Sequence, residues 1–288
     1  MRYQLLFLAA FSFFFCLSPV HGHELPDGAV PLEKSEKCAG CHPVIFKEWQ
    51  ESFHAKSSAH KDPAHKAVHQ AFVKSMTDQG KQGNYHCGNC HAPMSDNLAD
   101  LMSGKAELDS GNWTQTEGVG CTFCHRIDSV IEKEKFNQYK LNKDGAFHTA
   151  QATNPNAPHK TALSPLFANG QVCMGCHSHK INGKGAKICV MKEEGGGDCL
   201  SCHMPQAVGG PAIGSMTKNT HRSHKMPGGH DLDMLKKAVT FEAGIKSEGK
   251  RKIIDIKVKN IIQHTFPSTN PMRIAFVKVT AKDKTGKV

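Results

Sequence analysis

Five copies of the pattern Cys-x-x-Cys-His run along this chain. Two thiols three positions apart, followed at once by an imidazole, are the attachment signature of c-type haem, in which the thiols form thioethers and the histidine binds the iron. The sequence therefore predicts five covalent c-type haems. The predicted thioether residues are Cys38, Cys41, Cys87, Cys90, Cys121, Cys124, Cys173, Cys176, Cys199 and Cys202. The predicted proximal iron ligands are His42, His91, His125, His177 and His203.

The opposite face of each iron decides what such a chain does. A second strong ligand makes an electron-transfer centre, whereas an open face lets a substrate bind. Twelve histidines remain for five positions, after the motif histidines and the two near the predicted cleavage site, His21 and His23, are set aside. The supply therefore permits a second histidine at every iron. The candidates for this distal role are His54, His264, His148, His224, His230 and His179.

Other residues leave alternatives open. His65 and His69 share one face of an expected helix, where either can bind iron or both can be solvated or bond propionates. Cys189 stands outside the motifs and is expected to be a buried free thiol, an intermolecular disulfide partner or a redox group. Structural zinc is disfavoured, because each cysteine pair carries its own histidine and the number of pairs is odd.

The N-terminus has the composition of a signal peptide. Arg2 precedes an apolar run over residues 5–17, which is too short for a typical membrane-spanning helix. We expect a signal peptide over 1–22, a pentahaem domain over 23–237 and a β-rich segment over 238–288. No later stretch approaches 18 apolar residues, so no stable membrane span is expected after cleavage. Export places the chain in the periplasm, with the cell surface or extracellular space as the alternative.

The formal charge of +10 does not indicate nucleic-acid binding. Each ferric haem with two histidine ligands and ionised propionates contributes about −1, which brings the mature holoprotein to about +4. The basic residues therefore mostly balance haem propionates. Aromatic residues are not interleaved with the lysines, as they often are on nucleic-acid-binding surfaces.

The expected fold is mainly α and loop-rich, organised around five covalent haems, with a small C-terminal β-segment. Pro43 begins a predicted helix that runs to about Ser57, and a second helix is predicted over 64–76. Glycine and proline clusters at 195–197, 209–211 and 227–229 predict loops. Alternating apolar and polar residues predict strands over 239–245, 252–258 and 274–281.

The first haem motif and the residues after it resemble the opening of the cytochrome c-552/4 family. Cys38-Ala-Gly-Cys-His is followed by an aromatic residue and then by Trp49-Gln-Glu-Ser52-Phe-His54. In that family the last histidine is a distal haem ligand, and the resemblance assigns this role to His54. The family is related to the haem arrays of hydroxylamine oxidoreductase and multihaem nitrite reductase, and implies parallel and perpendicular haem pairs.

Later segments extend the resemblance. Cys90-His-Ala-Pro with Glu117-Gly-Val-Gly-Cys121 is similar to the second and third haem segments of such proteins, and His224-Lys-Met-Pro-Gly-Gly-His230 to the last. The stretch around His264 and Pro267 resembles a loop in the β-domain of many multihaem cytochromes. Ser268-Thr-Asn replaces the usual Thr-Gly there.

Three functions are compatible with these patterns. We expect a periplasmic electron carrier with mostly bis-His haems, which exchanges electrons with a redox donor and acceptor such as a quinol-linked cytochrome or a terminal reductase. The alternative is an oxidoreductase acting on hydroxylamine, nitrite or a sulfur oxyanion at one open haem. A third is a homo-oligomeric subunit of an extracellular cytochrome filament. No Cys-x-x-Cys-Lys motif is present, and no catalytic residue is assigned.

Overall fold

The structure is a computed structural model of the chain. It describes residues 23, 25–81, 83, 85–133, 136–151, 156–178, 180–181, 185–191, 198–215, 219–268, 273–282 and 285–287. The predicted signal peptide over 1–22, the candidate ligand His179 and the predicted loop over 195–197 lie outside these residues.

Short helices carry the haem motifs. Because about 3.6 residues make one helical turn, a single turn brings the two cysteines and the histidine of a motif to one side of the backbone. The second to fifth motifs each form such a turn, which ends at the motif histidine; these are α3 (Gly88–His91), α6 (Cys121–His125), α7 (Met174–His177) and α8 (Cys199–His203). The first motif follows the 3₁₀ helix η1 (Ser35–Cys38) and leads directly into α1 (Pro43–Glu51).

The remaining helices connect or flank the motifs. Pro43 occupies the first turn of α1, as predicted, but the helix ends at Glu51 rather than near residue 57, because Ser52 takes an extended backbone. The predicted helix over 64–76 is confirmed as α2 (Pro63–Asp78), whose N-terminus is capped by Asp62. The others are α4 (Leu98–Ser103), α5 (Trp113–Thr116), η2 (Pro165–Phe167), η3 (Gln171–Cys173) and α9 (Leu232–Ala238).

Every sheet in the described residues has two strands. Four are short: β1 (Ile127–Ile131) with β2 (Gln138–Leu141), β3 (Phe147–Thr149) with β4 (Thr161–Leu163), β5 (Lys180–Ile181) with β6 (Lys187–Ile188), and β7 (Gln206–Val208) with β8 (Thr220–Arg222). The fifth pairs β9 (Val239–Glu248) with β10 (Arg251–Asn260), antiparallel along their whole length.

The described residues thus form a loop-rich fold of small helices and small two-stranded sheets, so the expectation of a mainly α protein is only partly right. The third predicted strand, over 274–281, is wrong: that segment is extended but pairs with no described strand. The loops predicted over 209–211 and 227–229 are confirmed.

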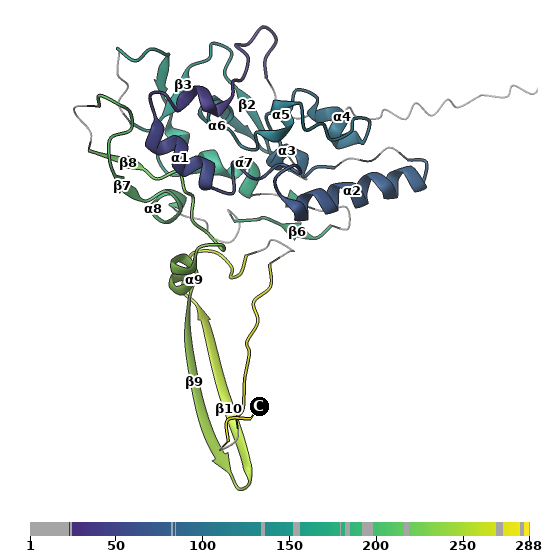
Figure 1. Cartoon of the computed structure of the whole chain (residues 1–288), viewed down its shortest axis with the longest axis vertical. Helices are drawn as coiled ribbons and strands as arrows, with labels where there is room; N and C mark the ends of the chain where they lie inside the picture. Colours follow the sequence, from purple (N-terminus) through teal and green to yellow (C-terminus); the bar gives the residue numbers. More distant parts are fainter. Residues whose placement is uncertain are drawn as a thin grey trace, which may run out of the picture.

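The protein core lies at the junction of several haem motifs. Phe123 of the third motif packs with Tyr139, Ile127 and Val172, and the motif cysteines Cys124, Cys173 and Cys176 border this cluster. Figure 1 shows a body that contains α1 to α8 and the short sheets, from which the β9–β10 hairpin extends far away. None of the described helices is long and apolar enough to cross a membrane.

Candidate functional site

Each motif histidine lies near the imidazole ring of one other histidine. Four of these pairs have ring centroids 6.1–6.3 Å apart: His42 with His159, His54 with His177, His125 with His224, and His203 with His264. Two imidazoles that bind one iron from opposite faces, each nitrogen about 2 Å from the metal, have centroids about 6 Å apart. These four pairs therefore have the spacing of a bis-histidine iron site.

Backbone carbonyls orient most of these rings. The Nδ1 atoms of four motif histidines donate to carbonyl oxygens: His42 to Pro211, His91 to Ser57, His125 to His148 and His203 to Pro227, over 2.6–3.0 Å. On the partner side, Nδ1 of His224 donates to the Arg222 carbonyl at 2.8 Å, and Nδ1 of His264 to that of Thr265 at 3.1 Å. A neutral imidazole that carries its hydrogen on Nδ1 presents the Nε2 lone pair, the atom that binds iron.

Burial keeps several of these imidazoles neutral. Desolvation, reinforced by neighbouring histidines, lowers the pKa of His54 to about 3 and that of His224 to about 4. The pKa values of His125 and His177 are also lowered, with burial as the main cause. Since a metal binds only the deprotonated imidazole, these surroundings hold the rings in the form that can bind iron at neutral pH.

The second motif differs from the other four. The rings of His91 and His65 have centroids only 4.3 Å apart, and both Nδ1 atoms donate to the carbonyl of Ser57. His69, one turn further along α2, contacts the ring of Tyr85. The Nε2 atoms of His65 and His69 are buried and have no hydrogen-bond partner. The second motif therefore has two buried imidazoles available from α2, His65 and His69, and the ring of His65 packs against that of His91.

Among the six predicted distal ligands, His54, His224 and His264 face a motif histidine. His148 instead directs Nδ1 to the Ile127 carbonyl and Nε2 toward the Asn142 amide. His230 is exposed and packs on the ring of Phe53. His159 and His65 face motif histidines but were not among the six. For His159 the sequence offered no signal beyond its place among the unassigned histidines.

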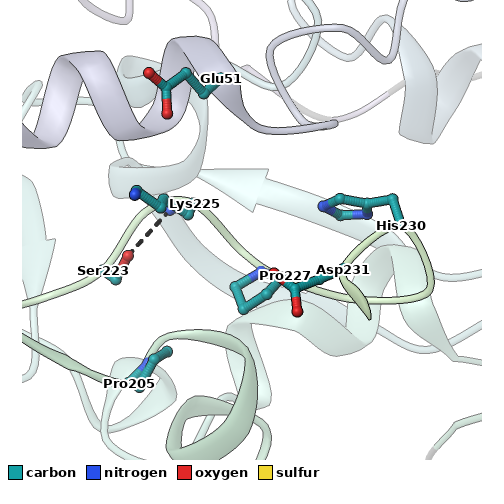
Figure 2. A pocket seen from close by; sticks show the side chains of 7 residues that line it. All are labelled: Glu51, Pro205, Ser223, Lys225, Pro227, His230 and Asp231. Carbon is teal, nitrogen blue, oxygen red and sulfur yellow. Dashed lines mark hydrogen bonds between the residues drawn. The ribbon is translucent and has the colours of Figure 1, made fainter. Parts of the chain in front are cut away.

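A pocket of about 280 Å³ lies beside the fifth motif (Figure 2). Pro227, whose carbonyl accepts from His203, forms part of its wall, and His230 stands at its rim. Its lining residues are Glu51, Pro205, Ser223, Lys225, Pro227, His230 and Asp231. This mixed and charged lining is unlike the apolar surroundings of a haem.

Cysteines of different motifs meet in pairs. The thiols of Cys38 and Cys121 hydrogen-bond, which raises the pKa of Cys38 and lowers that of Cys121. Similar thiol pairs join Cys90 to Cys176 and Cys173 to Cys199. Because a thioether would tie each cysteine to the edge of its haem, thiols that meet would bring haem edges together. The pairs link the first motif to the third, the second to the fourth, and the fourth to the fifth.

The segment after α1 holds His54 in place. Trp49 is buried and its indole N–H donates to the Val119 carbonyl at 2.8 Å, while the Val119 N–H donates to the His54 carbonyl at 2.9 Å. The Ser52 hydroxyl donates to the Trp49 carbonyl at 2.6 Å and ends the helix. The spacing Trp-x-x-Ser-x-His thus fixes a turn that brings His54 to His177 of the fourth motif.

Cys189, the cysteine outside the motifs, is a free, half-buried thiol. Burial raises its pKa, which makes the thiol less reactive. In the described residues, no group of three or more histidine, cysteine, aspartate and glutamate side chains has the geometry of a protein-only metal site. The ligand geometry present is that of histidine pairs.

Comparison with known proteins points to multihaem cytochromes. The family described as cytochrome c554 and c-prime matches residues 37–126. The solved penta-haem cytochrome c552 from Thermochromatium tepidum is similar to this chain, with a TM-score of 0.68 and 26% identity over 88% of this chain and 72% of that one. No curated protein sequence matches the chain.

The fold and the attachment motifs define a multihaem c-type cytochrome. Its residues 37–126 are similar to the cytochrome c554 and c-prime family. The side chains fit the haem that this class carries, because each motif has its two cysteines and a histidine on one turn, and four motif histidines have a second imidazole at the distance that an iron requires.

Proposed function

We propose that the chain binds five c-type haems, numbered 1 to 5 in motif order, and transfers electrons between redox partners outside the cytoplasm. The main supporting observation is the set of histidine pairs: four motif histidines have a second imidazole at the spacing of a bis-histidine iron site, and His65 is the second imidazole nearest to His91. When bound, each haem supplies an iron that cycles between the ferric and ferrous states. The assigned pairs are His42 and His159, His91 and His65, His125 and His224, His177 and His54, and His203 and His264.

The role of the protein in this function is to hold the second ligand in place. A carbonyl on Nδ1 fixes the orientation and tautomer of an imidazole and raises its basicity toward iron. Contacts between distant segments bring the ligands together, as when His54 and Val119 meet through their backbones. A closed coordination shell changes little between oxidation states, which favours electron transfer over substrate binding.

The thiol pairs support an order for the haems. Cys38 meets Cys121, and Cys173 meets Cys199, which supports a position for haem 1 beside haem 3 and for haem 4 beside haem 5. Cys124 and Cys173 border the same buried cluster around Tyr139, which brings haems 3 and 4 together. The proposed path is therefore 1–3–4–5, with haem 2 as a branch at haem 4 through Cys90 and Cys176.

If the protein is an enzyme, haem 2 is the site where we expect its substrate to bind. The centroid distance of 4.3 Å between His65 and His91 leaves no room for an iron between the rings as they stand. If His65 stayed off the metal, haem 2 would have the open face that a small substrate such as hydroxylamine or nitrite needs. This observation makes an oxidoreductase with its active centre at haem 2 the second candidate function.

Exogenous ligands separate the two functions. The oxidised holoprotein is titrated with azide, nitrite and hydroxylamine while its absorption spectrum is recorded. Electron transfer through closed haems predicts an unchanged spectrum with azide and nitrite, and simple reduction without turnover with hydroxylamine. A ligand-induced shift that amounts to one haem in five, together with catalytic consumption of nitrite or hydroxylamine, would establish the second function instead.

A further inference from the structure

The C-terminal part of the chain forms a projecting arm, defined here as the β9–β10 hairpin together with residues 273–282. The hairpin extends away from the haem-bearing body, and residues 273–282 also run away from it (Figure 1). The arm begins at the haem 5 end, because α9 leads directly into β9 and His264, which follows β10, lies across from His203.

One face of the hairpin is apolar and uncovered. Antiparallel pairing places Phe241 opposite Val258 and Ile245 opposite Ile254 on the same face. Phe241 is 59% exposed and Ile245 is 72% exposed. Residues 273–282 add Phe276, which is 86% exposed. The exposed apolar side chains of the hairpin form a strip of the kind that marks an interaction site in a folded protein.

The other face of the hairpin is polar and largely neutralised within itself. Lys246 pairs with Asp255 at 2.9 Å and Lys257 with Glu242 at 3.8 Å. Further lysines, Lys250 in the turn and Lys278 in the following segment, are not part of these pairs. The arm therefore combines an apolar strip with a surplus of positive charge at its margins.

The charge of the chain is concentrated in this region. Residues 239–288 contain eleven Lys and Arg against four Asp and Glu, a net +7 of the total +10. Residues 23–238 contain 24 Lys and Arg against 22 Asp and Glu, and five bis-histidine ferric haems add about −5. The holoprotein is thus polarised, with a cationic arm on a mildly anionic body.

We propose that the arm is the docking element for an acidic, one-electron redox protein that exchanges electrons at haem 5. This rests on the proposed electron-transfer function. An apolar strip with a charged margin is the usual composition of a protein interface, and opposite charge on the partner accelerates encounter and fixes orientation. The position of His264 between the arm and His203 brings the docked partner to the haem 5 end of the path.

The observations favour an acidic partner over a second copy. Face-to-face packing of two apolar strips would bring two arms of charge +6 together. Docking of the arm on the body of another copy would satisfy its charge but not its apolar strip, because the exposed apolar side chains of the described body, such as Val44, Val68 and Leu163, are scattered over separate elements.

Binding is measured by isothermal titration calorimetry with the holoprotein and an acidic flavodoxin as the probe, at low and at 0.3 M salt. The arm variant K250E/K259E/K278E is compared with K66E/K105E/K140E, which makes the same change in net charge on exposed body lysines. We expect the arm variant to weaken binding at least tenfold at low salt and to lose most of the salt dependence. The body variant should change Kd less than threefold. The single variant I245S tests the apolar strip, and is expected to weaken binding severalfold at both salt concentrations.

Equal losses in the two charge variants would overturn the proposal, since only overall charge would then matter. Arm-dependent binding to vesicles of phosphatidylglycerol and phosphatidylcholine without flavodoxin binding, or arm-dependent dimers in light scattering, would assign the arm to a membrane or to a second copy instead. The calorimetric titration measures binding and does not depend on electron transfer. If the arm does not bind the probe but all five haems are closed, only the docking proposal is rejected. If one haem is open and consumes substrate, the proposed electron-transfer function is rejected.

Discussion

At the scale of single residues, the second imidazole at each motif is the decisive group. The five motif histidines bring identical chemistry, and only the side chain opposite determines whether an iron is closed. Burial and carbonyl contacts at Nδ1 prepare His224 for this task, and burial alone prepares His54, whose Nδ1 is buried without a partner. His65, like His224, combines burial with a carbonyl contact at Nδ1. Its ring lies closer to that of its motif histidine, His91, than the rings of the other pairs do.

The assignment of His65 to haem 2 is tested by substitution. Replacement of His65 by alanine should open one iron, so that one fifth of the low-spin ferric haem becomes high-spin in the electron paramagnetic resonance spectrum. Replacement of His69, one turn along the same buried face of α2, serves as the matched control and should leave the spectrum unchanged. If His69→Ala opens the haem and His65→Ala does not, the two roles are exchanged.

At the scale of elements, short segments hold the ligands in place. Gly118 has a positive φ of +79°, and a Cβ there would lie 2.4 Å from the carbonyl oxygen of His54. The same loop donates the Val119 N–H to that carbonyl. The loop before the third motif therefore sets the position of His54, the proposed distal ligand at the fourth.

Replacement of Gly118 by alanine should displace His54 and weaken its bond to the iron of haem 4. We expect about 2–4 kcal/mol lower stability, from the left-handed backbone and the collision together, and partial high-spin character. Gly80→Ala is the control, because Gly80 also has a positive φ, of +59°, but open space around its Cβ position. Equal losses of stability in thermal unfolding, with unchanged haem spectra, would contradict a role for Gly118 in placing His54.

The sequence predicts the local elements better than the contacts between them. The motif turns and α2 depend on near neighbours, so spacing and capping residues such as Asp62 predict them. The ligand pairs depend on distant contacts: His42 and Pro211 meet across 169 positions, and no periodicity encodes that meeting. The sequence therefore does not distinguish His159, which faces His42, from His148, whose ring nitrogens face Ile127 and Asn142.

The C-terminal segment shows a second reason why sequence patterns do not predict the whole fold. Alternation of apolar and polar residues predicted the strands over 239–245 and 252–258, which form β9 and β10. The same pattern over 274–281 gives an extended segment without a described strand partner. A strand needs a neighbour to supply its hydrogen bonds, and alternation in the segment does not supply one.

At the scale of the whole molecule, the haem motifs and the protein core occupy the same place. Phe123, Tyr139 and Val172 are buried among the cysteines of the third and fourth motifs. Much of the remaining interior is built from short helices and loops that covalent attachment would tie to the haems. This arrangement accounts for the small sheets, and it gathers the five attachment points into one body from which the cationic arm projects (Figure 1).

The central claim is that five irons are each closed by two histidines. The most direct measurement is a quantitative low-temperature electron paramagnetic resonance spectrum of the fully oxidised holoprotein, referred to the haem content found by mass spectrometry. The account predicts a mass increase of five haems and ferric signals that are entirely low-spin. A high-spin signal that integrates to one haem or more, or a mass with fewer than five haems, would contradict it.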